Sequence, residues 1–161
     1  MIAAFTPGLD RAGFRCGDRL ADKYFRAQGA REAAKGVVAL FVLTSPPDPL
    51  PRGFYVLSGA TVLLPDLLGP GIRGVSRYPA LHAARLSRLC VDRRHRRQGL
   101  GRALLEDALE RLRALAAPPV AVIADAPTET ARCFYAARGF VAFAEREGQM
   151  FLPLTRQGGA P

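Results

Sequence analysis

The chain has few residues of the kinds that build metal centres or disulfide frameworks. Its 161 residues include three cysteines, Cys16, Cys90 and Cys133, and two histidines, His82 and His95. The cysteines form no C-x-x-C pair, and two histidines offer few co-ligands, so we expect neither a metal site nor a disulfide framework. A cysteine nucleophile would need a neighbouring base that the sequence cannot place, so small buried thiols are the simpler interpretation.

Long apolar runs and leader sequences are absent too. No stretch approaches the roughly 18 to 20 consecutive apolar residues of a membrane span. The first residues, MIAAFTPGLDRAGF, lack the ordered basic, apolar and cleavage regions of a signal peptide. We therefore expect a cytoplasmic protein with no membrane contact. The length and the 49% hydrophobic content predict one domain over residues 1–161, with a loose tail from about residue 155.

Lysine is scarce, yet the chain is strongly basic. Only Lys23 and Lys35 are lysines among 23 basic residues, and 14 acidic residues leave a net charge of +9. Within residues 85–102, where Asp92 is the one acid, lie Arg85, Arg88, Arg93, Arg94, Arg96, Arg97 and Arg102. Codon bias can explain the choice of arginine but not the excess of basic residues. That excess predicts a polyanionic partner such as RNA or DNA.

The arginine-rich segment also contains the most informative motif. Residues 86–105, LSRLCVDRRHRRQGLGRALL, run from a short apolar strand through a turn into an amphipathic helix. Gly99 and Gly101 let backbone N–H groups approach a ligand closely, and the unpaired amides that open the helix add positive potential. The spacing Arg96-x-x-Gly99-x-Gly101 matches neither G-x-G-x-x-G nor the lysine-containing P-loop. The turn therefore predicts a phosphate-bearing cofactor of another kind, the alternative being an ordinary helix-opening loop.

The first half of the chain predicts one helix followed by strands. Asp18 is expected to cap a helix that weakens at Gly29. The proline-rich residues 45–53 predict a long hairpin connection between two strands. Over the whole chain the expected strands are residues 37–44, 54–64, 86–91, 120–124, 141–144 and 149–154.

Two further helices are expected after the turn. From Leu100 apolar residues recur at spacings of three and four for about four turns, and Pro118 ends this helix. The next helix opens at Thr128 or Thr130, and Gly139 is placed to cap its C-terminus. Strands before the motif, followed by alternating helices and strands, indicate an α+β domain around a mixed sheet.

This order of strand, Arg96-x-x-Gly99-x-Gly101 turn and long helix resembles the cofactor motif of the GNAT family of N-acetyltransferases. The resemblance implies the GNAT fold, an α+β architecture whose central mixed sheet is splayed at the cofactor strand and carries helices on both faces. It also implies acetyl-CoA as co-substrate, with its pyrophosphate at the turn and its pantetheine arm along the strand. The cofactor-binding residues so implied are Leu89, Cys90, Val91, Arg96, Arg97, Gln98, Gly99, Leu100, Gly101, Arg102 and Phe134.

Acetyl transfer from a thioester needs a neutral amine, a donor for the oxyanion and a proton for the departing thiolate. In its position shortly before Gly139, Tyr135 resembles the tyrosine that many family members use as the general acid. Packing beside Phe134 is the alternative role for this side chain. The strand amide of Cys90 or Val91 is expected to serve as the oxyanion donor.

The strand before the turn also bears on the substrate. It contains no Asp or Glu within residues 86–91, where some relatives carry a base, and Asp92 only follows it. A lysine side chain with a pKa of about 10.4 needs a base, whereas an α-amine with a pKa of about 7.7 to 8.0 is already partly neutral. The sequence therefore favours an α-amine as acceptor.

Further motifs resemble a narrower branch of the family, the acetyltransferase toxins of bacterial toxin-antitoxin modules. In order, they are FRCG at residues 14–17, FYVLS at 54–58, RYP at 77–79 and LSRLCVD at 86–92. The resemblance implies acetylation of the α-amine of aminoacyl-tRNA, inhibition of translation, a ribbon-helix-helix antitoxin and a homodimer. The candidates for contact with RNA are Arg77, Arg85, Arg93 and Arg94, with solvent exposure as the alternative for each.

Two other functions remain open. An N-acetyltransferase that acts on a small amine or a protein N-terminus would transfer the acetyl group without RNA and with little dependence on salt. A non-catalytic RNA-binding or regulatory protein could use the same scaffold, because a fold alone does not assign an activity.

Overall fold

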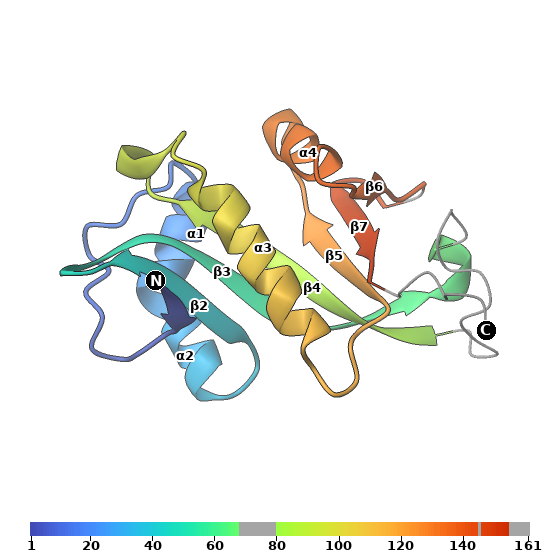
Figure 1. Ribbon diagram of the computed structural model, residues 1–161, viewed down its shortest axis with the longest axis horizontal. Coiled ribbons are helices and arrows are strands. Elements are labelled where there is room, and N and C mark those ends of the chain that lie inside the picture. Colours follow the sequence, from blue (N-terminus) through green and yellow to red (C-terminus); the bar gives the residue numbers. More distant parts are fainter. Residues whose placement is uncertain (68–79, 145, 155–161) are drawn as a thin grey trace. The chain divides into compact units, whose positions relative to one another are not determined.

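The computed structural model describes residues 1–67, 80–144 and 146–154 (Figure 1). Its strands are β1 (Ile2–Ala4), β2 (Ala39–Ser45), β3 (Asp48–Leu63), β4 (Ala80–Val91), β5 (Ala121–Asp125), β6 (Val141–Ala142) and β7 (Gln149–Pro153). Its α-helices are α1 (Arg19–Lys23), α2 (Gly29–Ala34), α3 (Leu100–Arg113) and α4 (Glu129–Ala136). Shorter helical turns are the π-turn Tyr24–Gln28 and the 3₁₀ turns Leu64–Leu67 and Arg93–His95. None of the described helices is long and apolar enough to cross a membrane.

The strands form one mixed sheet in the order β1-β2-β3-β4-β5-β7-β6. The pairs β1–β2, β2–β3, β5–β7 and β6–β7 are antiparallel, whereas β4 and β5 are parallel. A parallel pair needs a crossover connection, and α3 lies in that connection. The expected α+β class and mixed sheet are confirmed.

The described packing divides the chain into two compact units. The first combines Met1–Ser58 with Ser87–Arg111, and the second combines Gly59–Leu86 with Leu112–Pro161. The second has its own core around β5, made of Val62, Leu67, Leu81, Ala83, Ala121, Ile123, Phe143 and Phe151. The single domain expected over residues 1–161 stays a prediction.

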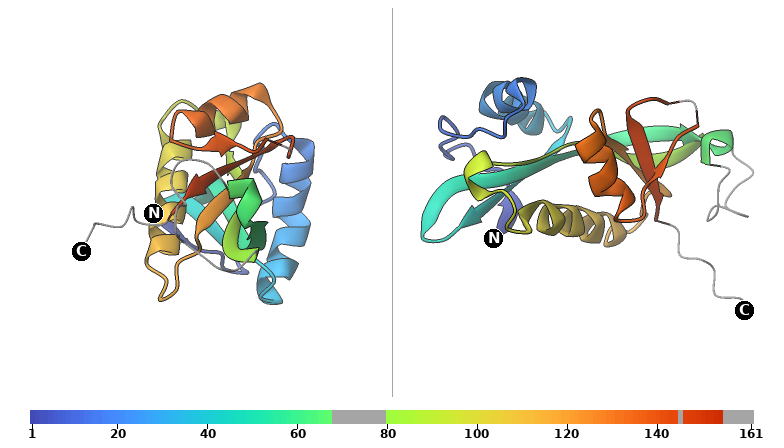
Figure 2. Two further views of the ribbon diagram at one scale, coloured as in Figure 1. Left: turned by 90° about the vertical axis from the view of Figure 1, so that its right-hand side faces the viewer. Right: turned by 90° about the horizontal axis from the view of Figure 1, so that it is seen from above.

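In the first unit, helices cover both faces of the strands (Figure 2). The ring of Phe54 on β3 stacks on Phe25 at 4.2 Å between centroids and meets the edge of Phe14 at 5.4 Å. Its neighbour Tyr55 faces the other way, as successive strand residues do, and its hydroxyl donates to Asp107 of α3. The α1–α2 segment therefore covers one face and α3 the other, as expected.

The first helix begins as predicted but ends later. Asp18 Oδ1 accepts from the amides of Leu20 at 2.9 Å and Ala21 at 3.2 Å, which confirms the cap. The helix does not end near Gly29, because it continues through the π-turn to Ala34. Gly29 is buried, and a Cβ there would lie 3.0 Å from Cε1 of Tyr24. This glycine allows close packing inside a helix, a role that the sequence pattern does not distinguish from a helix end.

The predicted long hairpin connection is wrong. Ser45 pairs with Asp48, so β2 and β3 are joined by the two residues Pro46 and Pro47. The register shifts between Leu43 and Ser45, which leaves an irregular stretch around the remaining prolines. Prolines donate no ladder hydrogen bond and are tolerated in a strand where the ladder is interrupted.

Other boundaries differ by a few residues. The strand β1 was not predicted, and β4 begins at Ala80 rather than residue 86. The helix α3 covers the four turns expected but ends at Arg113, before Pro118. Thr128, rather than Thr130, caps α4, and Gly139 has a φ of +89° just beyond its end, as expected for a C-terminal cap.

Candidate active site

The strand that leads into the turn is placed as the sequence predicts. Among the described residues, β4 pairs with β5 at residues 84–86, and β4 then continues to Val91. The half-buried residues Leu89, Cys90 and Val91 lie in this extension. Gly53 of β3 lies against it, because a Cβ there would be 2.9 Å from the Cys90 carbonyl oxygen. The strand segment proposed for the thioester is thus held by close backbone packing.

The turn that follows has the conformation of an anion cradle. Arg97 has a φ of +60° and Gly99 a φ of +76°, and both residues are exposed. Nothing lies within 4 Å of a Cβ built on Gly99, so the space in front of this residue is open. The first α3 bond runs from Ala103 N to Gly99 O at 3.1 Å. The amides of the intervening residues, 100–102, have no acceptor within the helix and fit a pyrophosphate group.

The three arginines of the turn differ in what their side chains contact. The Arg96 guanidinium donates through Nη2 to the carbonyl oxygen of Cys16. The Arg102 side chain pairs with Glu106 at 2.6 Å within α3. Arg97 makes no ion pair or side-chain hydrogen bond with the described residues, and Gln98 beside it is exposed. Of these arginines, Arg97 is the one whose side chain no other described residue already pairs with or hydrogen-bonds.

Asp92 fastens the end of β4 to the N-terminal segment. Its side chain has no exposed surface and accepts from Arg15 N at 3.0 Å and from Arg94 N at 2.9 Å. The Arg94 guanidinium adds Nε at 2.8 Å and Nη2 at 3.0 Å. Burial alone would raise the pKa of this carboxyl, but the hydrogen bonds from Arg94 and Arg15 outweigh it and hold the pKa well below its usual range.

The sequence did not reveal that Asp92 would accept hydrogen bonds from Arg15 and Arg94. It showed only that this residue follows the strand. A signal did exist. An Asp directly after an apolar strand, two residues before an amide that it can accept from, is typical of a turn-initiating residue. The partner Arg15 had no such signal, because it lies 77 residues away in the chain.

The candidates for contact with RNA differ in how far they are already paired. Arg85 forms an ion pair with Asp125 at 2.8 Å, and Arg94 forms the pair with Asp92. The Arg93 side chain is exposed and makes no ion pair or hydrogen bond with the described residues. Arg77 lies outside the described residues. Arg93 is therefore the best placed of the described three to meet a further anion.

Tyr135 and Phe134 lie on α4 in the second unit. Tyr135 is 4% exposed, and its ring contacts Phe134 and Phe140 with centroids 5.1 Å and 5.0 Å away. The Arg138 guanidinium lies 3.9 Å over the Phe134 ring and donates to the Phe134 carbonyl at 2.7 Å. This packing fixes the position of the tyrosine, which both of its expected roles require.

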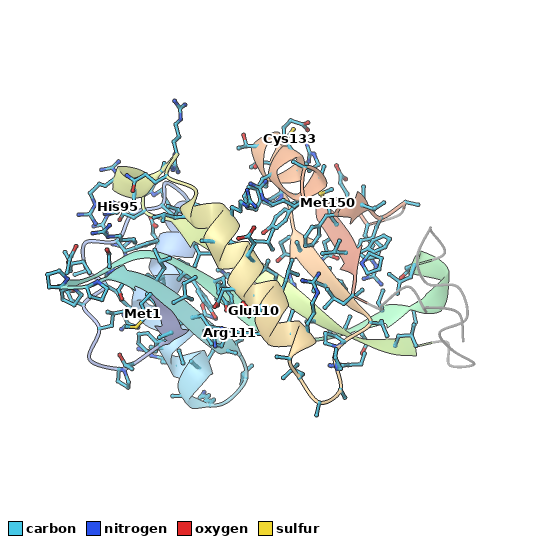
Figure 3. All side chains as sticks on the ribbon, in the orientation of Figure 1. Met1, His95, Glu110, Arg111, Cys133 and Met150 are labelled. Carbon is cyan, nitrogen blue, oxygen red and sulfur yellow. The ribbon has the colours of Figure 1, made fainter. Side chains whose placement is uncertain are left out.

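The cysteines form no metal or disulfide site among the described residues. Interaction with the Cys90 thiol lowers the pKa of Cys16, and interaction with Cys16 together with burial raises the pKa of Cys90. Cys133 is exposed on α4 (Figure 3). No three His, Cys, Asp or Glu side chains come together as metal ligands in residues 1–67, 80–144 and 146–154.

Known proteins resemble this chain over most of its length. A relative named "Probable toxin TacT" from Sinorhizobium fredii (strain NBRC 101917 / NGR234) is 27% identical over 154 residues, 90% of this chain and 85% of the relative. The structure of AtaT complexed with acetyl-methionyl-tRNAfMet superposes with a TM-score of 0.88 at 23% identity, covering 95% of this chain and 94% of that one. The structure of AtaTR bound with AcCoA has a TM-score of 0.82 at 24% identity, covering 95% and 92%.

A family model also matches the chain, in agreement with its fold and with the turn at residues 96–101. The family model described as "Acetyltransferase (GNAT) domain" matches residues 71–154, more than half of the chain. This range contains the strand β4, the anion cradle, α3 and the tyrosine-bearing helix α4. The chain therefore belongs to the GNAT family of acetyltransferases.

Proposed function

We propose that this chain is the toxin of a toxin-antitoxin module, which uses acetyl-CoA to acetylate the α-amine of aminoacyl-tRNA and so blocks translation. The observation that carries the proposal is the anion cradle beside an excess of positive charge. The amides of residues 100–102 and Arg97 suit the cofactor phosphates. The exposed Arg93, close by in sequence, is left for a second anion.

Acetyl-CoA supplies the activated acetyl group, and the chain's own residues bind and orient it. The backbone amides that open α3, with Arg97, would hold the pyrophosphate. Leu89, Cys90 and Val91 would line the pantetheine arm, and an amide of this strand would stabilise the oxyanion. Phe134 is proposed to contact the cofactor beside Tyr135, which would protonate the departing sulfur.

The acceptor is proposed to be an α-amine because no carboxylate is free to act as a base on β4. Residues 86–91 contain no acid, and the carboxylate of Asp92 is buried and already accepts four hydrogen bonds. An α-amine has a pKa of about 7.7 to 8.0 and needs less help than a lysine. The amine of an aminoacyl ester, whose carboxylate is neutralised, should lose its proton at least as easily.

The relatives support the partners that we propose. AtaT has been seen with acetyl-methionyl-tRNAfMet, and AtaTR with AcCoA, at 23% and 24% identity to this chain. AtaT has also been seen bound to the C-terminus of the antitoxin AtaR. By analogy we propose a ribbon-helix-helix antitoxin, a homodimer and action in the cytoplasm, where aminoacyl-tRNA is used.

The test is acetyl transfer in vitro. The purified protein is incubated with radiolabelled acetyl-CoA and total charged tRNA, and label is expected at the aminoacyl end. Deacylated tRNA is the matched control, because it lacks the amine but keeps every phosphate. Absence of label from all charged species would reject the proposal. Transfer to a small amine or a protein N-terminus without RNA, at a rate insensitive to salt, would favour the second enzymatic function.

A further inference from the structure

The two neighbouring arginines of the turn differ in what their side chains touch. Arg97 has an exposed side chain that makes no ion pair or hydrogen bond with the described residues. The Arg96 side chain is also exposed, but its Nη2 donates to the carbonyl oxygen of Cys16, 80 residues earlier in the chain. Arg97 is thus exposed at the turn with no partner among the described residues, whereas Arg96 reaches residues 16–17 near the N-terminus.

The backbone of that segment is shaped to receive the guanidinium. Gly17 has a φ of +92°, which side-chain-bearing residues rarely adopt. A Cβ on Gly17 would lie 2.9 Å from Nη2 of Arg96. The glycine therefore provides both the conformation and the space that the contact with Arg96 requires.

Through Arg15, residues 15–17 also form hydrogen bonds with Asp92 and Arg93, and they lead directly into α1. Arg93 N donates to Arg15 O at 2.8 Å, and Asp92 accepts from Arg15 N at 3.0 Å. On the other side, Cys16 N donates to Oδ1 of Asp22 in α1 at 2.7 Å. A continuous chain of hydrogen bonds thus connects the cofactor turn to α1.

The helical segment that begins with α1 packs against the strand that would carry the thioester. Cys90 packs on the core cluster that contains Tyr24 and Phe25, both in the π-turn after α1. The Arg88 guanidinium lies 3.8 Å over the Tyr24 ring. The segment therefore forms a wall beside residues 88–90 on the face opposite α3, and a shift of residues 15–18 would move this wall.

We propose that Arg96 is a positioning residue for the acceptor rather than a ligand of the cofactor phosphates. Its guanidinium holds residues 15–18 and the start of α1, and so fixes the wall along which the amine approaches. The backbone of the turn and the Arg97 side chain bind the pyrophosphate. This inference rests on the proposed acetyltransferase function and assigns separate tasks to two adjacent arginines.

The test compares Arg96→Gln with Arg97→Gln, which remove the same charge at neighbouring positions. Acetyl-CoA affinity is measured by calorimetry, and kcat and KM for total charged tRNA are measured by label transfer. Arg96→Gln should leave the acetyl-CoA Kd within about twofold and lower kcat/KM for the acceptor at least about tenfold, because misplaced groups lose productive geometry. Arg97→Gln should raise the acetyl-CoA Kd several-fold. Arg96→Lys, which keeps a charged donor, should restore part of the acceptor kcat/KM.

A second readout does not depend on catalysis. Hydrogen exchange of the amides in residues 15–22 should quicken in Arg96→Gln and in Gly17→Ala, and should stay unchanged in Arg97→Gln. The inference is overturned if Arg96→Gln weakens acetyl-CoA as much as Arg97→Gln does while exchange in residues 15–22 is unaltered. If no acceptor is ever labelled, the proposed function fails, but calorimetry and exchange still decide whether Arg96 binds the cofactor or holds the segment.

Discussion

At the scale of single residues, Asp92 shows how a charge is kept in the interior of a protein. Its carboxylate is removed from water, which by itself penalises ionisation. Hydrogen bonds from Arg94 and from the Arg15 amide replace the lost water and keep the group charged. Arg94 is two residues from Asp92, but Arg15 is 77 residues away. The ionised form of Asp92 is therefore stabilised only when the fold brings Arg15 to it.

Asp92→Asn should destabilise the protein in a pH-dependent way. The folded pKa of Asp92 is depressed, so its contribution is present above the unfolded pKa of about 3.9 and is lost as pH falls through the folded pKa. We expect Asp92→Asn to lower the free energy of unfolding by about 2 to 3 kcal/mol at pH 7. The deficit should shrink below about pH 4. Urea unfolding of the wild type and the variant at pH 7, 5 and 3 measures this difference in unfolding free energy. A difference that is constant across this range would contradict a depressed pKa for Asp92.

Tyr135→Phe separates the two roles of the tyrosine. The change removes the hydroxyl and keeps the ring that packs on Phe134 and Phe140. If the hydroxyl protonates the leaving thiolate, kcat should fall about 100-fold or more with little change in the Kd of acetyl-CoA. If Tyr135→Phe lowers the stability of the protein but leaves kcat unchanged, the tyrosine is a packing residue. Label transfer and thermal unfolding of the same preparation distinguish the outcomes.

The residues that the sequence could predict are those whose signal is local. Asp18 caps its own helix, and Gly139 takes its positive φ just after its own helix, so both were visible in a few neighbouring residues. The contact of Arg96 with Cys16 could not be predicted, because it joins positions 80 residues apart. Sequence reasoning assigned Arg96 to the cofactor because the motif contains it, not because its side chain could be placed.

At the scale of elements, the predicted boundaries were correct where a single residue determines the end of an element. They were wrong where packing determines it. Thr128 and Thr130 were equivalent as helix starts in the sequence, and the chain turns into α4 at Thr128. The β2–β3 hairpin was expected to be a long loop because prolines break ladders. Its strands instead extend to Ser45 and Asp48, since pairing resumes beyond the irregular stretch. Proline content therefore misjudged the length of these strands.

The two threonines provide a matched pair for testing the cap of α4. Thr128 Oγ1 accepts from Ala131 N at 3.1 Å, whereas the exposed Thr130 lies inside the helix and its side chain makes no hydrogen bond with the described part of the chain. Thr128→Ala should lower the free energy of unfolding by about 1 kcal/mol. Thr130→Ala should change it by no more than about 0.5 kcal/mol, since alanine is also the better helix former. Equal effects in chemical denaturation would show that Thr128 does not act as the cap.

At the scale of the whole molecule, the net charge is +9, but many of the arginines that contribute positive charge already form ion pairs. Arg85, Arg94, Arg102 and Arg111 each face a carboxylate within 2.8 Å. Arg111 also stacks on Phe41 and donates to the Ile2 carbonyl, so its charge serves to hold α3 against the N-terminal strand (Figure 3). A count of basic residues thus overstates the charge that is available to a nucleic acid.

The salt dependence of RNA binding should reveal which arginines are available. Each phosphate that a protein cation neutralises adds about 0.7 to 0.9 to the slope of log K against log salt. Arg93→Gln should therefore weaken binding of total deacylated tRNA and reduce this slope by about one. Arg31→Gln removes the same charge from an exposed residue of α2 whose side chain makes no ion pair with the described residues. Within the first unit, α2 lies away from the Arg93–His95 turn (Figures 1 and 2). Arg31→Gln should leave the slope unchanged. Fluorescence anisotropy from 50 to 200 mM salt, a range that resolves such slopes, measures both variants. Equal slopes for the two variants would mean that RNA responds to net charge alone and that Arg93 has no contact of its own.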